Sequence, residues 1–260
     1  MDKLVNLLYF SATGTTARVM QAIGEGLGGG VRERDITHPY SRQALNFGPQ
    51  DLVVAGVPVY GGRVPDFLVD YLGRVKGDQT LALCVVVYGN RDYDDALLEL
   101  KDTMENNGFT AIAAGAFIGE HSYTRLVGTG RPDQQDLKIA RSFGVRVRQK
   151  LDAMMAGQPG WELVVKGSFP YKERTPKITA VPTIGADCLE CGMCAESCPM
   201  QAINWRNFRD IDGTKCILCC RCVKICPVQA VSISHERLDR VRQMLIDQYS
   251  QVRREPELFL

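Results

Sequence analysis

The sequence lacks the marks of a membrane or exported protein. It has no apolar run approaching the ~20 residues that a membrane-spanning helix requires, and no lipidation signal ends it. It does not open with an apolar leader flanked by basic residues. We therefore expect a soluble, cytoplasmic protein without a membrane span. Disulfides are disfavoured, because they need an oxidising compartment.

An excess of charge of one sign is also missing. The 260 residues include 31 Lys and Arg against 30 Asp and Glu, which gives a formal net charge of +1. Because these charges are scattered and form no basic stripe, we expect no nucleic-acid partner. The length is sufficient for one full domain and a smaller one, so two domains are predicted.

Cysteine, in contrast, is concentrated. Nine of the ten cysteines lie in residues 188–227, and eight of them form two copies of Cys-x2-Cys-x2-Cys-x3-Cys-Pro, offset by 28 residues. Soft thiolates at this spacing hold a cubane iron–sulfur cluster, and the fourth cysteine of each run ligates the neighbouring cluster. The crossed ligand sets predicted for two 4Fe-4S clusters are Cys188, Cys191, Cys194 and Cys226 for one cluster, and Cys216, Cys219, Cys222 and Cys198 for the other.

The cysteine pattern resembles that of the bacterial two-cluster ferredoxin and matches it at every ligand. Structural zinc is the alternative, but its Cys-x2-Cys pairs are separated by a longer loop, whereas each run here spans eleven residues and is closed by proline. Cys220 breaks the register beside Cys219, and we interpret it as a spare packed thiol. Cys84 is expected to be a small buried residue within a strand.

A candidate phosphate site follows the first apolar run. Residues 4–10 predict a buried strand of a parallel sheet, and a helix capped by Thr15 or Thr16 is predicted to continue to about Leu27. Successive N–H groups and a helix N-terminus favour phosphate, and the absence of a P-loop lysine leaves a monophosphate as the better fit. An ordinary cap on the first helix of an α/β domain is the alternative. The loop consists of Ser11, Ala12, Thr13, Gly14, Thr15 and Thr16.

This loop resembles the phosphate loop of flavodoxins, which holds the phosphate of FMN. A second loop extends the resemblance, with Tyr60 as the candidate to stack on the isoalloxazine ring. Gly61 or Gly62 there permits the positive φ of a peptide that flips when the flavin gains a proton. An exposed loop aromatic is the alternative interpretation of Tyr60.

A third loop lies where flavodoxins place their second flavin loop. The resemblance implies that Tyr88 or Tyr93 covers the other ring face, with backbone groups of Gly89 and Asn90 at the pyrimidine edge. Asn90 is alternatively a turn residue. The residues that the resemblance assigns to FMN in the two later loops are Pro58, Val59, Tyr60, Gly61, Gly62, Arg63, Tyr88, Gly89, Asn90 and Tyr93.

Further apolar stretches predict strands over residues 31–36, 51–57, 80–87 and 110–118. Asp92 is alternatively the N-cap of a helix that reaches about residue 107, and Pro132 with Asp133 opens a final helix that reaches about residue 155. Five strands alternating with helices predict an α/β fold, a flavodoxin-like doubly wound parallel sheet of order 2-1-3-4-5. The loop with His121 and Tyr123 follows the fifth strand at the ligand-binding edge, although a lone histidine is more often structural.

The predicted domain organisation has four parts. Residues 1–156 form the flavodoxin-like FMN-binding domain, and residues 157–184 form an extended linker. Residues 185–234 form a small α+β ferredoxin domain with two 4Fe-4S clusters. Residues 235–260 form a C-terminal amphipathic helix that packs against a domain, because apolar residues recur there at helical spacing. Those apolar residues are Leu238, Val241, Leu245, Tyr249 and Val252.

Together the resemblances cover most of the chain and match the flavodoxin–ferredoxin fusion proteins found mainly among anaerobes. They imply an electron-transfer iron–sulfur flavoprotein that exchanges electrons between its clusters and FMN, serves redox protein partners and needs no covalent catalytic residue. The alternative is an FMN-dependent reductase of a small acceptor, a quinone or nitro compound, bound near His121. A redox-sensing regulator ranks below both, because no DNA-binding segment is visible. No dinucleotide fingerprint supports a nicotinamide cofactor.

Overall fold

The computed structural model describes residues 3–158 and 162–260. Within them, the main sheet has six strands in the order β10-β7-β6-β4-β1-β2. Its neighbouring strands pair in parallel, except that β10 is antiparallel to β7. The strands are β1 (Leu4–Tyr9), β2 (Val31–Asp35), β4 (Asp51–Pro58), β6 (Thr80–Tyr88), β7 (Phe109–Ile118) and β10 (Glu257–Phe259).

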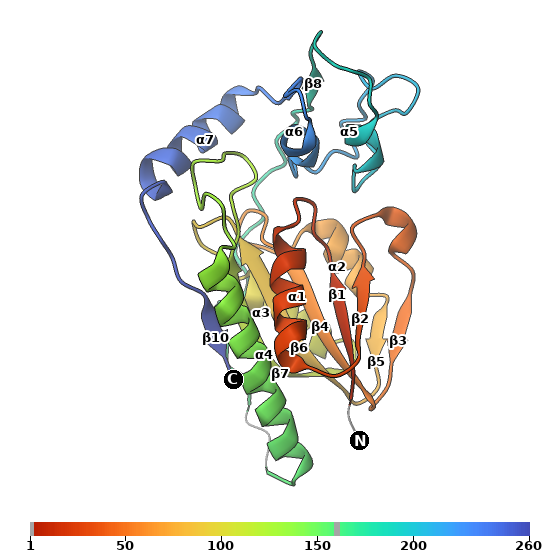
Figure 1. Cartoon of the computed structure of the whole chain (residues 1–260), viewed down its shortest axis with the longest axis vertical. Helices are drawn as coiled ribbons and strands as arrows, with labels where there is room; N and C mark the ends of the chain where they lie inside the picture. Colours follow the sequence, from red (N-terminus) through yellow and green to blue (C-terminus); the bar gives the residue numbers. More distant parts are fainter. Residues whose placement is uncertain (1–2, 159–161) are drawn as a thin grey trace.

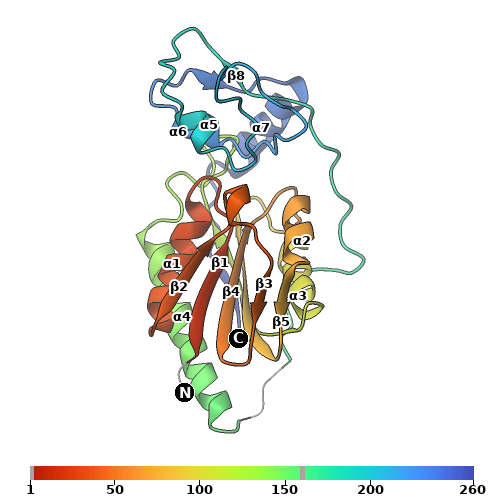
Figure 2. The ribbon, with the colours of Figure 1, turned by 90° about the vertical axis from the view of Figure 1, so that its right-hand side faces the viewer.

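Helices cover both faces of this sheet (Figures 1 and 2). On one face lie α1 (Thr15–Leu27) and α4 (Gln134–Met155), and on the other lie α2 (Asp66–Leu72) and α3 (Ala96–Glu105). The central strands are apolar and almost wholly buried because each is covered on both sides. The predicted α/β fold with a mostly parallel sheet is confirmed. We call residues 3–158 the sheet unit.

Two short strands of the sheet unit were not predicted, whereas one helical turn was expected within residues 38–50. Strands β3 (Leu45–Phe47) and β5 (Val75–Gly77) pair in parallel as a separate two-stranded sheet. A 3₁₀ turn, η1 (Pro39–Ser41), lies in the stretch that the sequence predicted as loop with a helical turn. Elements of three residues are too short for a periodic pattern, so their pairing depends on the tertiary fold.

The cap of α1 differs from the prediction. Gly14, not Thr15 or Thr16, is the N-cap residue, and no side chain makes a capping hydrogen bond there. Gly14 adopts φ of +85°, a conformation that glycine reaches without steric cost. The hydroxyl of Ser11 instead accepts the amide of Ala17 at 3.0 Å.

For the later helices, the start of α4 agrees with the prediction and the N-cap of α3 does not. Asp133 caps α4 in a capping box with Asp136, as predicted. The residue before α3 is Asp95 and not Asp92. The Asp92 carboxylate accepts the amide of Asp94 at 3.0 Å, which holds a turn ahead of the helix.

An extended segment, residues 162–182, runs along the side of the sheet unit (Figure 2). Leu163 and Val165 are buried in the same apolar core as α3. The Asp95 carboxylate accepts the amides of Ser168 and Lys172 at 2.9 and 2.6 Å. Apolar burial and these charge-assisted bonds therefore fix the segment to the sheet unit. Residues 159–161 of the predicted linker lie outside the described residues.

Residues 183–234, which we call the cysteine unit, lie over the carboxyl ends of the parallel strands (Figures 1 and 2). They contain α5 (Met193–Glu196), α6 (Arg221–Ile225) and an antiparallel pair, β8 (Thr183–Ile184) with β9 (Val231–Ser232). The backbone repeats at the 28-residue offset of the sequence. Positive φ angles pair Glu190 with Leu218, Gly192 with Cys220, and Gln201 with Gln229.

The C-terminus differs from the prediction. Helix α7 (Glu236–Tyr249) buries Leu238 and Leu245 as expected, but it ends before Val252, which is 42% exposed. Residues 250–260, which we call the strap, descend along the sheet unit and include β10 (Figure 1). Strand β10 covers the edge of β7, whose backbone groups would otherwise lack partners. In the described residues no helix is both long and apolar enough to span a bilayer.

Candidate functional site

The loop of residues 11–16 joins β1 to α1 at the carboxyl edge of the sheet. The amide of Ser11 donates to the Thr37 hydroxyl at 2.9 Å, which fixes the start of the loop. Within the described part of the chain, no hydrogen bond uses the amides of residues 13–16. A Cβ built on Gly14 would meet no atom within 4 Å, so there is open space beside the loop. These free N–H groups and the amino end of α1 together suit an anion.

The second predicted loop forms a tight turn. Tyr60 and Arg63 exchange backbone hydrogen bonds of 3.0 and 3.2 Å around Gly61 and Gly62. Both glycines have positive φ, +61° and +87°, as the prediction required of at least one of them. The Tyr60 ring is half-buried and not fully exposed. Burial raises the pKa of its hydroxyl well above the usual value, and the neighbouring thiol of Cys219 adds to the effect.

Arg63 is occupied by other protein groups. Its guanidinium forms a two-point ion pair with Glu99, with N···O distances of 2.9 and 2.7 Å, and lies 4.8 Å from the ring centroid of Tyr171. Glu99 also accepts the amide of Val64 at 2.8 Å. Arg63 therefore holds the base of the Tyr60 turn, and its guanidinium is not free for a ligand.

The third predicted loop is covered by the protein itself. Tyr88 is 3% exposed and Tyr93 is fully buried, with their ring centroids 5.5 Å apart. The Tyr93 hydroxyl donates to Glu257 of the strap at 2.7 Å. Neither tyrosine presents a ring face at the surface, so the predicted role of covering a flavin from this side does not fit their placement. The strap, which the sequence did not reveal, explains this difference.

Asn90 is buried and adopts φ of +61°. Its amide group donates to the carbonyl oxygens of Val252 and Tyr249 at 2.6 and 3.3 Å. The amide of Arg254 donates back to the Asn90 oxygen at 3.4 Å. The side chain of Asn90 is thus directed to the strap, and only its backbone remains for a ligand. Asn90 thus has the positive φ of a turn residue, and its side chain also bonds to residues 249 and 252.

The loop after β7 contacts the cysteine unit. Lys224 of α6 donates to the Glu120 carboxylate at 2.7 Å and to the His121 carbonyl at 3.0 Å. The His121 Nδ1 accepts the amide of Tyr123 at 3.1 Å. Burial, followed by the charges of Lys224 and Arg91, lowers the pKa of His121 to about 4. His121 is therefore neutral at pH 7 and acts here as a loop-shaping acceptor.

Besides Arg125, which donates to the Lys224 carbonyl at 3.3 Å, three arginines link the sheet unit to the cysteine unit or to α7. Arg42 donates to the Pro199 carbonyl at 2.7 Å, and Arg242 donates to the Tyr123 carbonyl at 2.9 Å. Arg221 donates to the carbonyl of Ala12, inside the loop of residues 11–16. These contacts hold the cysteine unit over the predicted ligand loops. Sequence reasoning missed all three arginines.

Two hollows divide the eight motif cysteines into the crossed sets that the spacing predicts. They have empty volumes of about 390 and 330 Å³, part of which is open to solvent. The first is lined by Cys198, Cys216, Cys219 and Cys222, and the second by Cys188, Cys191, Cys194 and Cys226. The copies also share amide–sulfur contacts of 3.3 Å, from Ala202 to Cys198 and from Ala230 to Cys226.

The thiols do not converge as a single-ion site requires. Among the described residues, no three Cys, His, Asp or Glu side chains are grouped closely enough to hold one metal ion. Tetrahedral zinc would need four thiolates about 2.3 Å from one point. A cluster of several irons binds each thiolate at a different iron, so its ligands are spread around it. Four thiols that line one hollow without meeting at one point are compatible with the spread ligands of a cluster.

Cys220 borders the first hollow but is directed elsewhere. Its Sγ lies 3.5 Å from the Leu218 carbonyl, and it packs in an apolar cluster with Leu238 and Ile233. Burial raises the pKa of its thiol to about 12. This placement agrees with a spare packed thiol.

Comparison with known proteins identifies the sheet unit. Residues 6–131 match the family model described as a flavodoxin domain, so the chain contains a flavodoxin-like domain. No curated protein matches the chain.

Solved structures similar to this chain include a flavodoxin from the domain Archaea, with 14% identity over 57% of this chain and 99% of that one, and a TM-score of 0.39. A flavodoxin of Streptococcus pneumonia TIGR4 shares 15% identity over 56% of this chain and 99% of its own, with a TM-score of 0.41. Rubredoxin oxygen:oxidoreductase from the anaerobe Desulfovibrio gigas shares 14% identity over 59% of this chain and 37% of its own, with a TM-score of 0.40.

Proposed function

We propose that this chain is an electron-transfer iron–sulfur flavoprotein, with FMN in the sheet unit and two 4Fe-4S clusters in the cysteine unit. When bound, each cluster would carry one electron at a time, and the flavin would carry one or two. Electrons passed between clusters and flavin would therefore couple one-electron donors to two-electron acceptors. One observation carries the proposal. Cys219, which borders the first hollow, is buried in the apolar core of the sheet unit, against which Tyr60 of the predicted flavin loop packs.

The chain's own residues would divide the work as follows. The free amides of residues 13–16 would receive the FMN phosphate, and Gly14 leaves room for it. Tyr60 would stack on the flavin ring, and the Gly61–Gly62 turn provides a backbone that tolerates positive φ beside it. The two crossed cysteine sets would hold the clusters. The contacts between the units would keep these groups close to one another.

The reductase alternative would place a small acceptor near His121. His121 is held on three sides, because its Nδ1 accepts an amide, its carbonyl binds Lys224 and its ring lies against Gly89. A Cβ built on Gly89 would come within 2.5 Å of the His121 ring. The histidine is thus part of the packing between the units, which favours a carrier that serves redox proteins. Saturable turnover of a quinone or nitro compound, lost in His121→Ala, would favour the reductase.

Cofactor analysis of protein purified without oxygen tests the proposal. We expect about eight irons with a matching amount of acid-labile sulfide for each chain. Mass spectrometry of the extracted flavin should identify FMN, because the loop of residues 11–16 offers a site for one terminal phosphate. Stoichiometric zinc without sulfide would contradict the cluster assignment, and FAD as the native flavin would contradict the flavin assignment.

A further inference from the structure

Arg221 has an unsatisfied group at the boundary between the units. It is the first residue of α6, and one terminal nitrogen of its guanidinium donates to the Ala12 carbonyl. Its Nε is buried and finds no hydrogen-bond partner in the described residues. A buried donor without an acceptor is destabilising, because it loses its bonds to water and gains none in return. The N–H of Nε is therefore suited to an acceptor that the described chain does not supply.

The loop that Arg221 contacts has no positively charged side chain. Residues 11–16 offer free amides and hydroxyls but include no lysine or arginine. A phosphate monoester carries up to two negative charges near neutral pH, and a guanidinium is its best-matched cationic partner in proteins. The cation missing from the loop is present on the other unit.

The internal repeat shows that this arginine is not a requirement of the cysteine fold. The equivalent position in the first copy, 28 residues earlier, is Met193, the first residue of α5. Both helices begin after a residue with positive φ, Gly192 in one copy and Cys220 in the other. The same backbone therefore forms without an arginine. Within the described residues, the hydrogen bond to the loop of residues 11–16 comes from the second copy, through Arg221, and the equivalent position of the first copy has no arginine.

We propose that Arg221 binds the phosphate of FMN, so that the phosphate site is shared between the sheet unit and the cysteine unit. This inference rests on the proposed function. The loop of residues 11–16 supplies amides from one side, and the guanidinium supplies the positive charge from the other. Binding of FMN and docking of the cysteine unit then stabilise each other, because each provides contacts that the other needs.

Two explanations compete with this proposal. Arg221 also lines the first hollow, so its guanidinium could serve the cluster proposed there, but loss of a bond to the cluster would not distinguish FMN from riboflavin. The other is a purely structural role, for which Arg242 provides a matched control. Arg242 crosses the same boundary, but its guanidinium is satisfied by the Tyr123 carbonyl, the Asp239 carboxylate and the Ile233 carbonyl. It makes no contact with the loop of residues 11–16 in the hydrogen bonds of the described chain. Loss of Arg242 thus weakens the boundary without removing a phosphate ligand.

The test compares FMN with riboflavin, which has the same ring and no phosphate. Full-length protein purified without oxygen is stripped of flavin, its iron and sulfide are checked, and both flavins are titrated by fluorescence quenching. Arg221→Met should weaken FMN binding roughly 10- to 100-fold, as expected for the loss of a hydrogen-bonded charge, and leave riboflavin almost unchanged. Arg221→Lys should fall between, because it keeps the charge and loses the planar fork. Arg242→Met should change the two flavins equally.

Two results would overturn the inference while leaving the proposed function intact. One is an equal loss of FMN and riboflavin in Arg221→Met, and the other is unchanged FMN affinity. If Arg221→Met is purified without its iron, the ratio of FMN to riboflavin affinity in Arg221→Lys decides the question in the same way. A wild-type protein that binds neither flavin would contradict the proposed function itself.

Discussion

Cys220 and Gly192 occupy equivalent places in the two copies of the cysteine motif, immediately before α6 and α5. Gly192 adopts positive φ freely, whereas Cys220 adopts it at φ of +58° with a side chain attached. Its thiol gains burial and a contact with the Leu218 carbonyl. Cys219 instead lines the hollow with the other motif cysteines of its set. Adjacent cysteines therefore have different roles.

Serine substitutions should separate these two cysteines. Cys219→Ser removes a predicted cluster ligand, so we expect the loss of about half of the iron and sulfide or more. Cys220→Ser should keep both clusters, with a stability change of about 1 kcal/mol from the lost apolar contact. Iron and sulfide analysis with the visible spectrum measures both outcomes. Equal cluster loss in the two variants would show that the assigned register is wrong.

The cysteine sets and the phosphate loop stay predictions, and the sequence could suggest them because the residues of each motif lie at short, regular spacing. Arg221 could not be predicted in this way, because its significance comes from facing Ala12, more than two hundred residues away. A comparison of the two copies would have provided a signal, since Arg221 replaces the Met193 of the first copy. Tyr93 was misjudged for a related reason, because the group that buries it belongs to the strap.

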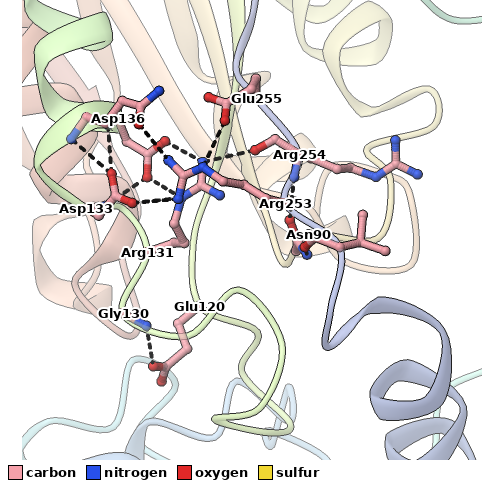
Figure 3. A network of polar contacts seen from close by, with 11 residues as sticks. Asn90, Glu120, Gly130, Arg131, Asp133, Asp136, Arg253, Arg254 and Glu255 are labelled. Carbon is pink, nitrogen blue, oxygen red and sulfur yellow. Dashed lines mark hydrogen bonds and ion pairs between the residues drawn. The ribbon is translucent and has the colours of Figure 1, made fainter.

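At the scale of elements, the strap links the flavin loops to the end of the chain. A buried ion pair of Arg131 with Asp136 anchors it, since Arg131 also donates to the Arg254 carbonyl at 3.0 Å (Figure 3). Arg253 adds an exposed pair with Asp133 at 2.7 Å. Asn90 completes the attachment from the third predicted loop. The strap therefore stabilises the third loop, which we propose to lie beside the flavin. The side chain of Asn90 is used for this attachment and is not available to the flavin.

Substitutions of Asn90 and Arg253 test this role. Asn90→Gly keeps the positive φ but removes the bonds to the strap, so we expect a loss of about 1–3 kcal/mol, or a fall in melting temperature of roughly 2–10 °C. Arg253→Ala removes a solvent-exposed pair and should cost less than about 1 kcal/mol. Thermal unfolding of the flavin-loaded protein measures both variants. An unchanged melting temperature with weakened flavin binding in Asn90→Gly would mean that its side chain serves the flavin directly.

The central strands and the long helices could be predicted, because burial on both faces and helical periodicity leave strong patterns. Strand β10 has no such pattern in the sequence. Its three residues form a strand because β7 has an open edge beside them, whereas the sequence placed them at the end of a helix predicted over residues 235–260. The tertiary contact determines the local structure there, so a local pattern could not reveal it.

At the scale of the whole molecule, the sequence indicated two units but not their relation. The polar contacts that join them are made by single side chains from distant segments, such as Arg42 with Pro199 and Lys224 with Glu120. Such contacts have no sequence signature. The first hollow lies beside the predicted Tyr60 loop, because Cys219, which lines this hollow, and Tyr60 belong to one apolar cluster. This arrangement makes electron exchange within one molecule the central expectation.

The rate of flavin reduction within the molecule tests that expectation most directly. Protein purified without oxygen and carrying both clusters and FMN would receive a limiting pulse of a one-electron donor, with the flavin absorbance followed at several protein concentrations. We predict a first-order rate that does not depend on protein concentration and that is lost in Cys219→Ser. A rate that rises in proportion to protein concentration, or one that Cys219→Ser leaves unchanged, would contradict the account.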